Sequence, residues 1–126
     1  MTRAHEFEDL KVWQLARGLV QSAYCVTGKR MFDKDHGLRD QLRRAAVSSM
    51  ANIAEGFERG SKRDFDRFLY IARGSAGEIR NHLYVAKDLD YITGVEFEQL
   101  KDQTVSLSRS LYRFIQHLES AGGGRA

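Results

Sequence analysis

Apolar residues recur at intervals of three and four through four long stretches of this 126-residue chain, and no proline interrupts them. Such spacing places apolar side chains on one face of an α-helix, and proline is the residue that breaks helices most strongly. The sequence also lacks the alternating β-branched runs and Asn-Gly turns that are typical of β-hairpins. The pattern therefore predicts an all-α fold.

The stretch Gln41–Phe57 has apolar residues on two sides of its expected helix. One side holds Leu42, Ala46, Ile53 and Phe57, and the other holds Val47, Met50 and Ala54. This apolar arc is wider than the stripe by which a surface helix packs against a core. We expect this helix to be the most enclosed one in the fold, with neighbours on both sides.

Turn and capping residues divide the chain into four helices. The first is expected from a cap at Asp9 to about Thr27, the second from about Leu38 to Glu58, the third from a cap at Ser61 to about Leu89, and the fourth from the capping box of Thr93 and Glu96 to about Ser120. Long helices joined by short loops predict an antiparallel up-down-up-down four-helix bundle. The whole chain, 1–126, is then a single domain with an ordered core at about 9–120.

The segments outside these helices are expected to be short and simple. Residues 1–8 are predicted to be frayed, and order is predicted to end at 122–124. Residues 29–37 are predicted to form a loop that Met31 and Phe32 hold on the bundle.

The sequence has no feature of an exported or membrane-spanning protein. No apolar run approaches the roughly 18 residues that cross a bilayer. The segment MTRAHEFED at the start lacks the apolar core of a signal peptide. Cys25 is the single cysteine, so no disulfide can form within the chain. We therefore expect a cytoplasmic protein without a membrane partner.

No arrangement of residues is typical of a catalytic or metal site. The four histidines lie in different segments, and none is placed with a carboxylate or a second histidine as a ligand pair. The Glu-x-x-His motif of di-iron bundles, Cys-His pairs and phosphate-binding loops are missing. Gly74 and Gly77, inside the third helix, are interpreted as places of close helix approach. We expect no catalytic residue, no metal and no cofactor.

Asn52 and Glu55 are polar residues among small and apolar neighbours. If they are buried, they need hydrogen-bond partners, because an unpaired buried polar group costs about 1–3 kcal/mol. Arg44, Arg73 or Arg80 is a suitable partner for Glu55. We interpret Asn52, Glu55, Arg44 and Arg73 as a structural polar network that fixes helix register. The alternative is that Glu55 is a catalytic or ligand-binding carboxylate.

The net charge of +3 comes from the middle of the chain, since residues 39–80 hold nine basic and six acidic residues. Four basic residues gather at the turn between the second and third helices: Arg59, Lys62, Arg63 and Arg67. Arg39 and Arg43, four residues apart, form a second band on the second helix. Clusters of this kind contact nucleic-acid phosphates without reading base sequence. The alternative is a solvated surface in which these cations pair with nearby acids.

Three motifs, in order along the chain, resemble those of a known family. They are FEDL with VW at residues 7–13, QLRRAA leading to NIAEGF at 41–57, and ARGS with Glu78 in the third helix. The sequence resembles the bacterial four-helix-bundle family encoded within intervening sequences of large-subunit ribosomal RNA genes. The accessory variability protein of diversity-generating retroelements belongs to the same wider group. Asp33 and Met50 stand where this family usually has proline.

The resemblance implies a homopentameric ring with a basic surface that binds nucleic acid, and in the retroelement branch a reverse transcriptase as partner. Ile71, Val85 and Leu89 beside the core seam of the third helix also favour a homo-oligomer, because exposed apolar patches mark interfaces. Our leading hypothesis is a non-enzymatic oligomeric bundle that binds RNA or a ribonucleoprotein through repeated basic patches. The alternative is a structural protein–protein interaction module without nucleic-acid binding, and an enzyme ranks third.

Overall fold

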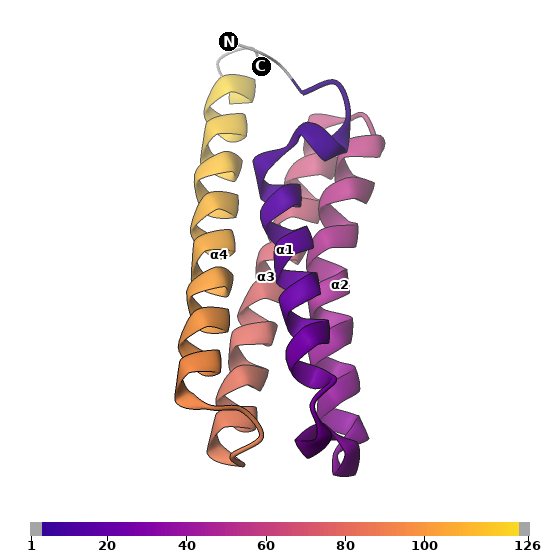
Figure 1. Cartoon of the computed structure of the whole chain (residues 1–126). Coiled ribbons are helices and arrows are strands. Elements are labelled where there is room, and N and C mark those ends of the chain that lie inside the picture. Colours follow the sequence, from indigo (N-terminus) through magenta and orange to yellow (C-terminus); the bar gives the residue numbers. More distant parts are fainter. Residues whose placement is uncertain (1–3, 124–126) are drawn as a thin grey trace.

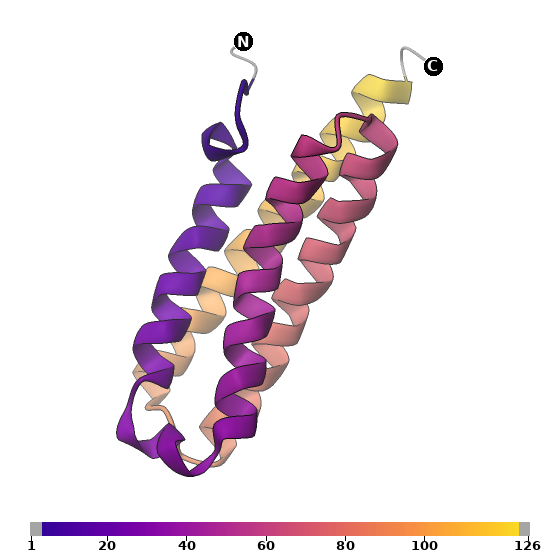
Figure 2. The ribbon, with the colours of Figure 1, turned by 90° about the vertical axis from the view of Figure 1, so that its right-hand side faces the viewer.

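The computed structural model describes residues 4–123, which form a bundle of four helices with two short 3-10 segments (Figure 1). In chain order these are η1 (Phe7–Asp9), α1 (Lys11–Thr27), η2 (Arg30–Lys34), α2 (His36–Glu58), α3 (Lys62–Asp88) and α4 (Gly94–Gly123). Successive helices run in opposite directions, and η1 lies at the same end of the bundle as the end of α4 (Figures 1 and 2). Residues 4–123 contain no strand. The predicted all-α, up-down-up-down bundle is confirmed.

One apolar core holds the four helices together. Helix α2 packs against α1 and α3, and α4 packs against α3 and α1, so the helices close around the core. The spacing of three and four predicts one apolar face on the third helix, from Phe65 to Ala86. This face is buried at Leu69, Ala72, Ala76, Ile79, Leu83 and Ala86, and Phe65 is half-buried. The same spacing predicts an apolar face on the fourth helix from Phe97 to Leu118. This face is buried at Phe97, Leu100, Thr104, Leu107 and Leu111, but Phe114 and Leu118 are half-buried and Ile115 is fully buried instead.

Three helix caps fix where the turns begin and end. The side chain of Ser61 accepts a hydrogen bond from the backbone N of Asp64 at 3.1 Å, as predicted. Thr93 and Glu96 form the predicted capping box, with backbone-to-side-chain distances of 2.9 and 3.1 Å. Asp35 caps α2 through the backbone N of Leu38 at 3.0 Å, so this helix begins two residues before the position predicted.

The prediction that Asp9 caps the first helix is wrong. Helix α1 begins at Lys11, and Asp9 instead ends η1, where its carboxylate accepts hydrogen bonds from the backbone N of His5 and Glu6. Phe7 of η1 packs against Trp13 with ring centroids 5.3 Å apart. The expected fraying of residues 1–8 is therefore wrong for 7–8, while residues 1–3 lie outside the described part of the chain.

The predicted loop at 29–37 contains η2 and is held by one aromatic side chain. Phe32 is fully buried and packs edge-on against Tyr91, with ring centroids 5.3 Å apart. Met31 is 40% exposed, so the prediction that it helps to hold the loop is wrong.

At the other end of the chain, α4 continues to Gly123 rather than ending near Ser120, and Gly124 lies outside the described residues.

Helix α2 is enclosed on one side more than on the other. It has neighbours in both α1 and α3, as expected. Its second apolar side remains partly open, however, because Val47 is 42% exposed and Met50 and Ala54 are half-buried. The expected burial of both sides is therefore wrong for the single chain.

Two glycines make the turn between α2 and α3 compact. Gly60 has a φ of +81°, a left-handed conformation that glycine adopts without steric cost. Gly56 lies where α2 and α3 approach most tightly, since a Cβ at this position would come within 2.6 Å of the Cβ of Phe68. The predicted close approach at Gly74 and Gly77 is wrong within this chain, because a Cβ at either position meets no atom within 4 Å.

Gly56→Ala is expected to destabilise the fold by about 1–3 kcal/mol, the usual cost of overpacking. The added Cβ would force α2 away from Phe68. Gly74→Ala is the matched control, because its Cβ enters open space and alanine favours the helix by up to about 1 kcal/mol. Thermal denaturation measures both. Equal melting temperatures for Gly56→Ala and the parent would contradict the close approach.

Glu96→Gln is expected to remove part of the stability in a pH-dependent way. Hydrogen bonds from Lys29 and from Thr93 lower the pKa of Glu96 below its ordinary value of 4.5. Because the folded pKa is the lower one, the stabilisation is present above pH 4.5 and is lost as the pH falls through the folded pKa. Melting curves should separate parent and variant at neutral pH and converge in acid. A difference in melting temperature between parent and variant that stays constant well below pH 4.5 would contradict this linkage.

Candidate nucleic-acid interface

The four basic residues predicted at the α2–α3 turn do lie together, but most of them are paired with acids. Arg59 bonds Glu55 at 2.9 Å, and this hydrogen bond raises the pKa of Arg59. Two further pairs are Lys62 with Asp66 at 3.0 Å and Arg67 with Asp64 at 3.8 Å. Arg63 forms no salt bridge with any described residue.

The charge of this turn is balanced once the paired acids are counted. The four cations stand against four carboxylates, which are Glu55, Glu58, Asp64 and Asp66. Arg59 and Arg67 also both lie against the ring of Phe68, with their guanidinium carbons 4.9 and 4.6 Å from its centroid. A phosphate that binds here must compete with carboxylates already in place.

Arg39 and Arg43 are both engaged within the chain. Arg39 lies 3.3 Å from the carboxylate of Asp40. Arg43 donates a hydrogen bond from Nε to the buried hydroxyl of Thr27 at 2.7 Å, and its guanidinium carbon lies 4.5 Å from the ring centroid of Tyr24. The contacts of Arg43 fasten α2 to α1, whereas that of Arg39 stays within α2. Both leave only part of each guanidinium for a ligand.

The two predicted basic groups lie at opposite ends of the bundle. Arg39 is in the first turn of α2 and Arg59 follows its last residue. Twenty residues of α-helix rise about 30 Å. The structure therefore does not join them into one surface.

The predicted polar network is not formed among the described residues. Asn52 donates to the backbone O and the hydroxyl of Ser48, at 2.8 and 3.0 Å. Glu55 is exposed and pairs with Arg59, not with Arg44, Arg73 or Arg80. The reason is the position of Glu55 near the end of α2, where its side chain points to solvent.

A second polar group bridges α2 and α3 instead. The hydroxyls of Ser48 and Ser75 are 3.0 Å apart. One and two turns further along α3, the carboxylate of Glu78 lies 3.6 Å from Nε2 of His82.

Within the described residues no group of three or more His, Cys, Asp or Glu side chains is placed to hold a metal ion. None of the described helices is long and apolar enough to cross a membrane.

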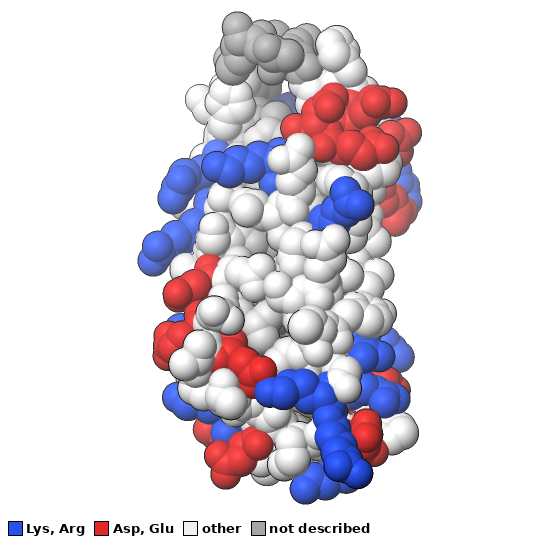
Figure 3. All heavy atoms as spheres, in the orientation of Figure 1, with Lys and Arg blue, Asp and Glu red and all other residues white. Residues whose placement is uncertain are grey.

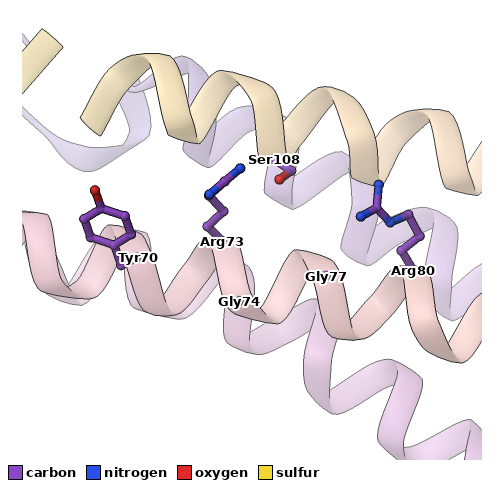
Figure 4. A pocket seen from close by; sticks show the side chains of 6 residues that line it. All are labelled: Tyr70, Arg73, Gly74, Gly77, Arg80 and Ser108. Carbon is purple, nitrogen blue, oxygen red and sulfur yellow. The ribbon is translucent and has the colours of Figure 1, made fainter. Parts of the chain in front are cut away.

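The structure adds a groove between α3 and α4 that the sequence did not predict. It has a volume of about 350 Å³ and is lined by Tyr70, Arg73, Gly74, Gly77, Arg80 and Ser108. Figure 4 shows Tyr70, Arg73 and Arg80 projecting from α3 on the side that faces α4, with the two glycines between the arginines. We call this site the α3–α4 groove.

The two arginines of the α3–α4 groove are not paired with acids in the described part of the chain. Neither Arg73 nor Arg80 forms a salt bridge with a described residue. The Nε of Arg73 is buried without a hydrogen-bond acceptor, and its guanidinium carbon lies 4.8 Å from the ring centroid of Tyr112 on α4. Half-burying a cation without a partner is costly. An anion in the groove would compensate that cost.

One end of the groove is acidic. The hydroxyl of Tyr70 donates to Glu119 of α4 at 3.4 Å. Partial burial, and after it the negative charge of Glu119, raises the pKa of Tyr70 above its ordinary value of 10.0. Tyr70 is therefore neutral at physiological pH and presents an uncharged ring to the groove.

Glu55→Ala is expected to leave the stability of the single chain nearly unchanged, with a melting-temperature shift of at most about 3 °C. The reason is that both partners of its salt bridge are exposed, at 45% for Arg59 and 53% for Glu55. Thermal denaturation at low protein concentration measures this. A loss comparable with that of Gly56→Ala would show that Glu55 has a buried partner after all.

Comparisons with known proteins agree with this fold. The family model described as 23S rRNA-intervening sequence protein matches residues 8–113. Among solved structures, the chain is similar to a protein of unknown function from the S23 ribosomal protein family of Bacteroides thetaiotaomicron VPI-5482. That match has a TM-score of 0.75 and 21% sequence identity, and it covers 82% of this chain and 97% of the other. At this identity the likeness shows the fold alone.

No curated protein sequence matches the chain. The family model covers most of the residues, including the three motifs at 7–13, 41–57 and 72–78 apart from the first residue of the first motif. The chain therefore belongs to the 23S rRNA-intervening sequence protein family.

Proposed function

We propose that this protein is a non-enzymatic, oligomeric helical bundle that binds RNA through cations whose charge the chain itself does not neutralise. The observation that carries the proposal is the contrast between two basic sites. At the α2–α3 turn, three of four cations are held by carboxylates. In the α3–α4 groove, Arg73 and Arg80 have no such partner among the described residues. The association of the family with ribosomal RNA genes supports RNA as the polyanion.

The turn residues Arg59, Lys62, Arg63 and Arg67 remain part of the proposal as a weak, repeated contact. A single balanced patch attracts phosphates poorly. In an oligomer the same patch recurs, and the effective concentration of the second contact strengthens the first. Arg39 and Arg43 would contribute less, since both are engaged by Asp40 and Thr27.

Exposed apolar residues on α2 and α3 support the oligomer. Val47 is 42% exposed, and Ile71, Val85 and Leu89 are 41%, 39% and 49% exposed. Ile71, Val85 and the C-cap residue Leu89 lie on one side of α3, because they are separated by 14 and 4 positions. Apolar surface of this kind is usually covered by another subunit. The number five is taken from the family resemblance, and a reverse transcriptase-like partner remains a prediction.

The second candidate function is a structural protein–protein interaction module. It is favoured by an uncharged area in the middle of the face shown in Figure 3, with charged residues toward the two ends and along the left edge. Helix α1, which crosses this face, has no charged residue from Gly18 onward, and Gly28 ends the uncharged run. Tyr24 and Cys25 are exposed within that run. A neutral surface of this kind suits a protein partner better than RNA.

RNA affinity measured against salt concentration separates the two functions. The parent protein should bind RNA at low salt and lose affinity steeply as salt rises. Replacing both Arg73 and Arg80 with Gln should make the slope of log affinity against log salt shallower by about 1.4, at about 0.7 per phosphate contact on a single strand. The double variant Arg63→Gln, Arg67→Gln measures how much the α2–α3 turn contributes to the salt slope of RNA binding.

Arg30→Gln with Lys34→Gln is the matched control, because it removes the same charge from two exposed positions of η2, outside the α2–α3 turn and the α3–α4 groove. Its slope should equal that of the parent. Light scattering on the same samples should give the five-chain mass that the resemblance implies. A parent that binds no RNA at low salt rejects the RNA proposal in favour of the protein-interaction module, and a monomer at micromolar concentration rejects the oligomer.

A further inference from the structure

We infer that the α3–α4 groove binds single-stranded RNA, with phosphates on Arg73 and Arg80 and bases stacked on the neighbouring tyrosines. This inference rests on the proposed RNA binding and specifies its ligand and its site. It depends on four features of the groove: cations interspersed with tyrosines on one helix face, exposed rings held in place, open backbone at the glycines, and an acidic end.

Three cations and two tyrosines lie along the face of α3 that borders α4, with a tyrosine on either side of the two arginines. At spacings of three and four, this face holds Tyr70, Arg73, Gly77, Arg80, Tyr84 and Lys87. Residues at these spacings are neighbours on one helix face. No acidic residue interrupts the series, which carries three positive charges. A basic track interleaved with aromatic rings is the arrangement by which proteins bind single strands without sequence preference.

The tyrosine rings are exposed and yet fixed. Tyr70, Tyr84 and Tyr112 are 46%, 43% and 43% exposed. Tyr84 packs edge-on against Phe97 of α4, with ring centroids 4.9 Å apart. Tyr112 lies under the guanidinium of Arg73, 4.8 Å from its carbon. A ring that is already oriented loses little freedom when a base stacks on it, so these contacts prepare the surface for stacking.

The two glycines leave the backbone of α3 open between the arginines. Glycine is unfavourable inside an exposed helix, and no contact within the chain explains Gly74 or Gly77, since a Cβ at either would meet nothing within 4 Å. Arg73 and Arg80 are seven residues apart, which corresponds to about 10 Å along the helix. The space between them admits a phosphate or sugar close to the helix backbone.

The groove favours a single strand over a duplex. In double-stranded RNA the bases are stacked on one another and cannot reach the tyrosine rings. In a single strand the bases are free to leave the stack while the phosphates stay on the arginines. Glu119 beside Tyr70 repels phosphates at that end. The bound strand therefore runs from Tyr70 toward Lys87 and Lys101, whose amines lie by the ring of Phe97 at 4.6 and 5.8 Å.

Fluorescence anisotropy with a labelled oligouridylate of about twelve nucleotides, and with an RNA duplex of the same length, tests the inference. The full-length parent should bind the single strand at least about tenfold more tightly than the duplex. Tyr70→Leu with Tyr84→Leu should weaken single-strand binding by about tenfold or more, the size expected for lost base stacking. The salt slope should not change, because no charge is removed.

Tyr24→Leu is the matched control, since Tyr24 on α1 has the same 43% exposure and lies outside the groove. Gly77→Gln is a second variant that puts a side chain into the groove without changing the charge, and its Cβ would meet no atom within 4 Å, so it keeps the test valid if Tyr84→Leu unfolds. Gly77→Gln should weaken the binding of single-stranded RNA and leave the melting temperature of the protein unchanged or higher. Equal affinity for the duplex, or tyrosine and glycine variants that bind like the parent, overturns this inference while RNA binding stands. Absence of binding to both RNAs overturns the proposed function as well.

Discussion

The packing of one apolar seam of α3 against α2 and α4 determines what the rest of that helix presents. The seam from Leu69 to Ala86 is buried, and its spacing of three and four fixes the rotation of the helix about its own axis. Once that rotation is fixed, each other face of α3 has a set position. One face carries Ile71 and Val85 and continues to the C-cap residue Leu89, and another carries the tyrosines and cations along the α3–α4 groove. The core therefore orients the surface that we propose to bind RNA.

Glycines have two different structural roles in this bundle: one allows close helix packing, and two others leave open space. At Gly56 the absence of a Cβ lets α2 approach Phe68, and the helices are tightly joined at that turn. At Gly74 and Gly77 no atom fills the space, and the helix loses stability without a contact in return. From sequence alone, the glycines inside α3 were interpreted as sites of close approach. Only the rotation of α3 shows that close approach occurs at Gly56 and that Gly74 and Gly77 face a groove.

Much of the fold could be predicted from the sequence because its signals are local. Two helix caps form as their spacing predicts, one at Ser61 and one from Thr93 and Glu96. The spacing of the apolar residues also predicted most of the residues of α3 and α4 that are buried. The site could not be predicted in the same way. The spacing of four between Glu55 and Arg59 does permit an ion pair, but the depth of Glu55 depends on how α2 packs. The α3–α4 groove depends on α4, because Ser108 and Tyr112 come from a segment more than 25 residues away in sequence.

The geometry of α3 also makes oligomerisation and RNA binding compatible. Consecutive residues of an α-helix differ by about 100° in direction, so Ile71 and Tyr70 point to different sides of α3. A second copy that covers Ile71, Val85 and Leu89 would contact the side of α3 toward α2, where Ser75 bonds Ser48. The α3–α4 groove lies on the other side, where Arg73 meets Tyr112. Each subunit of an oligomer built in this way would keep its groove open, and the weak phosphate contacts of one groove would be multiplied by those of its neighbours.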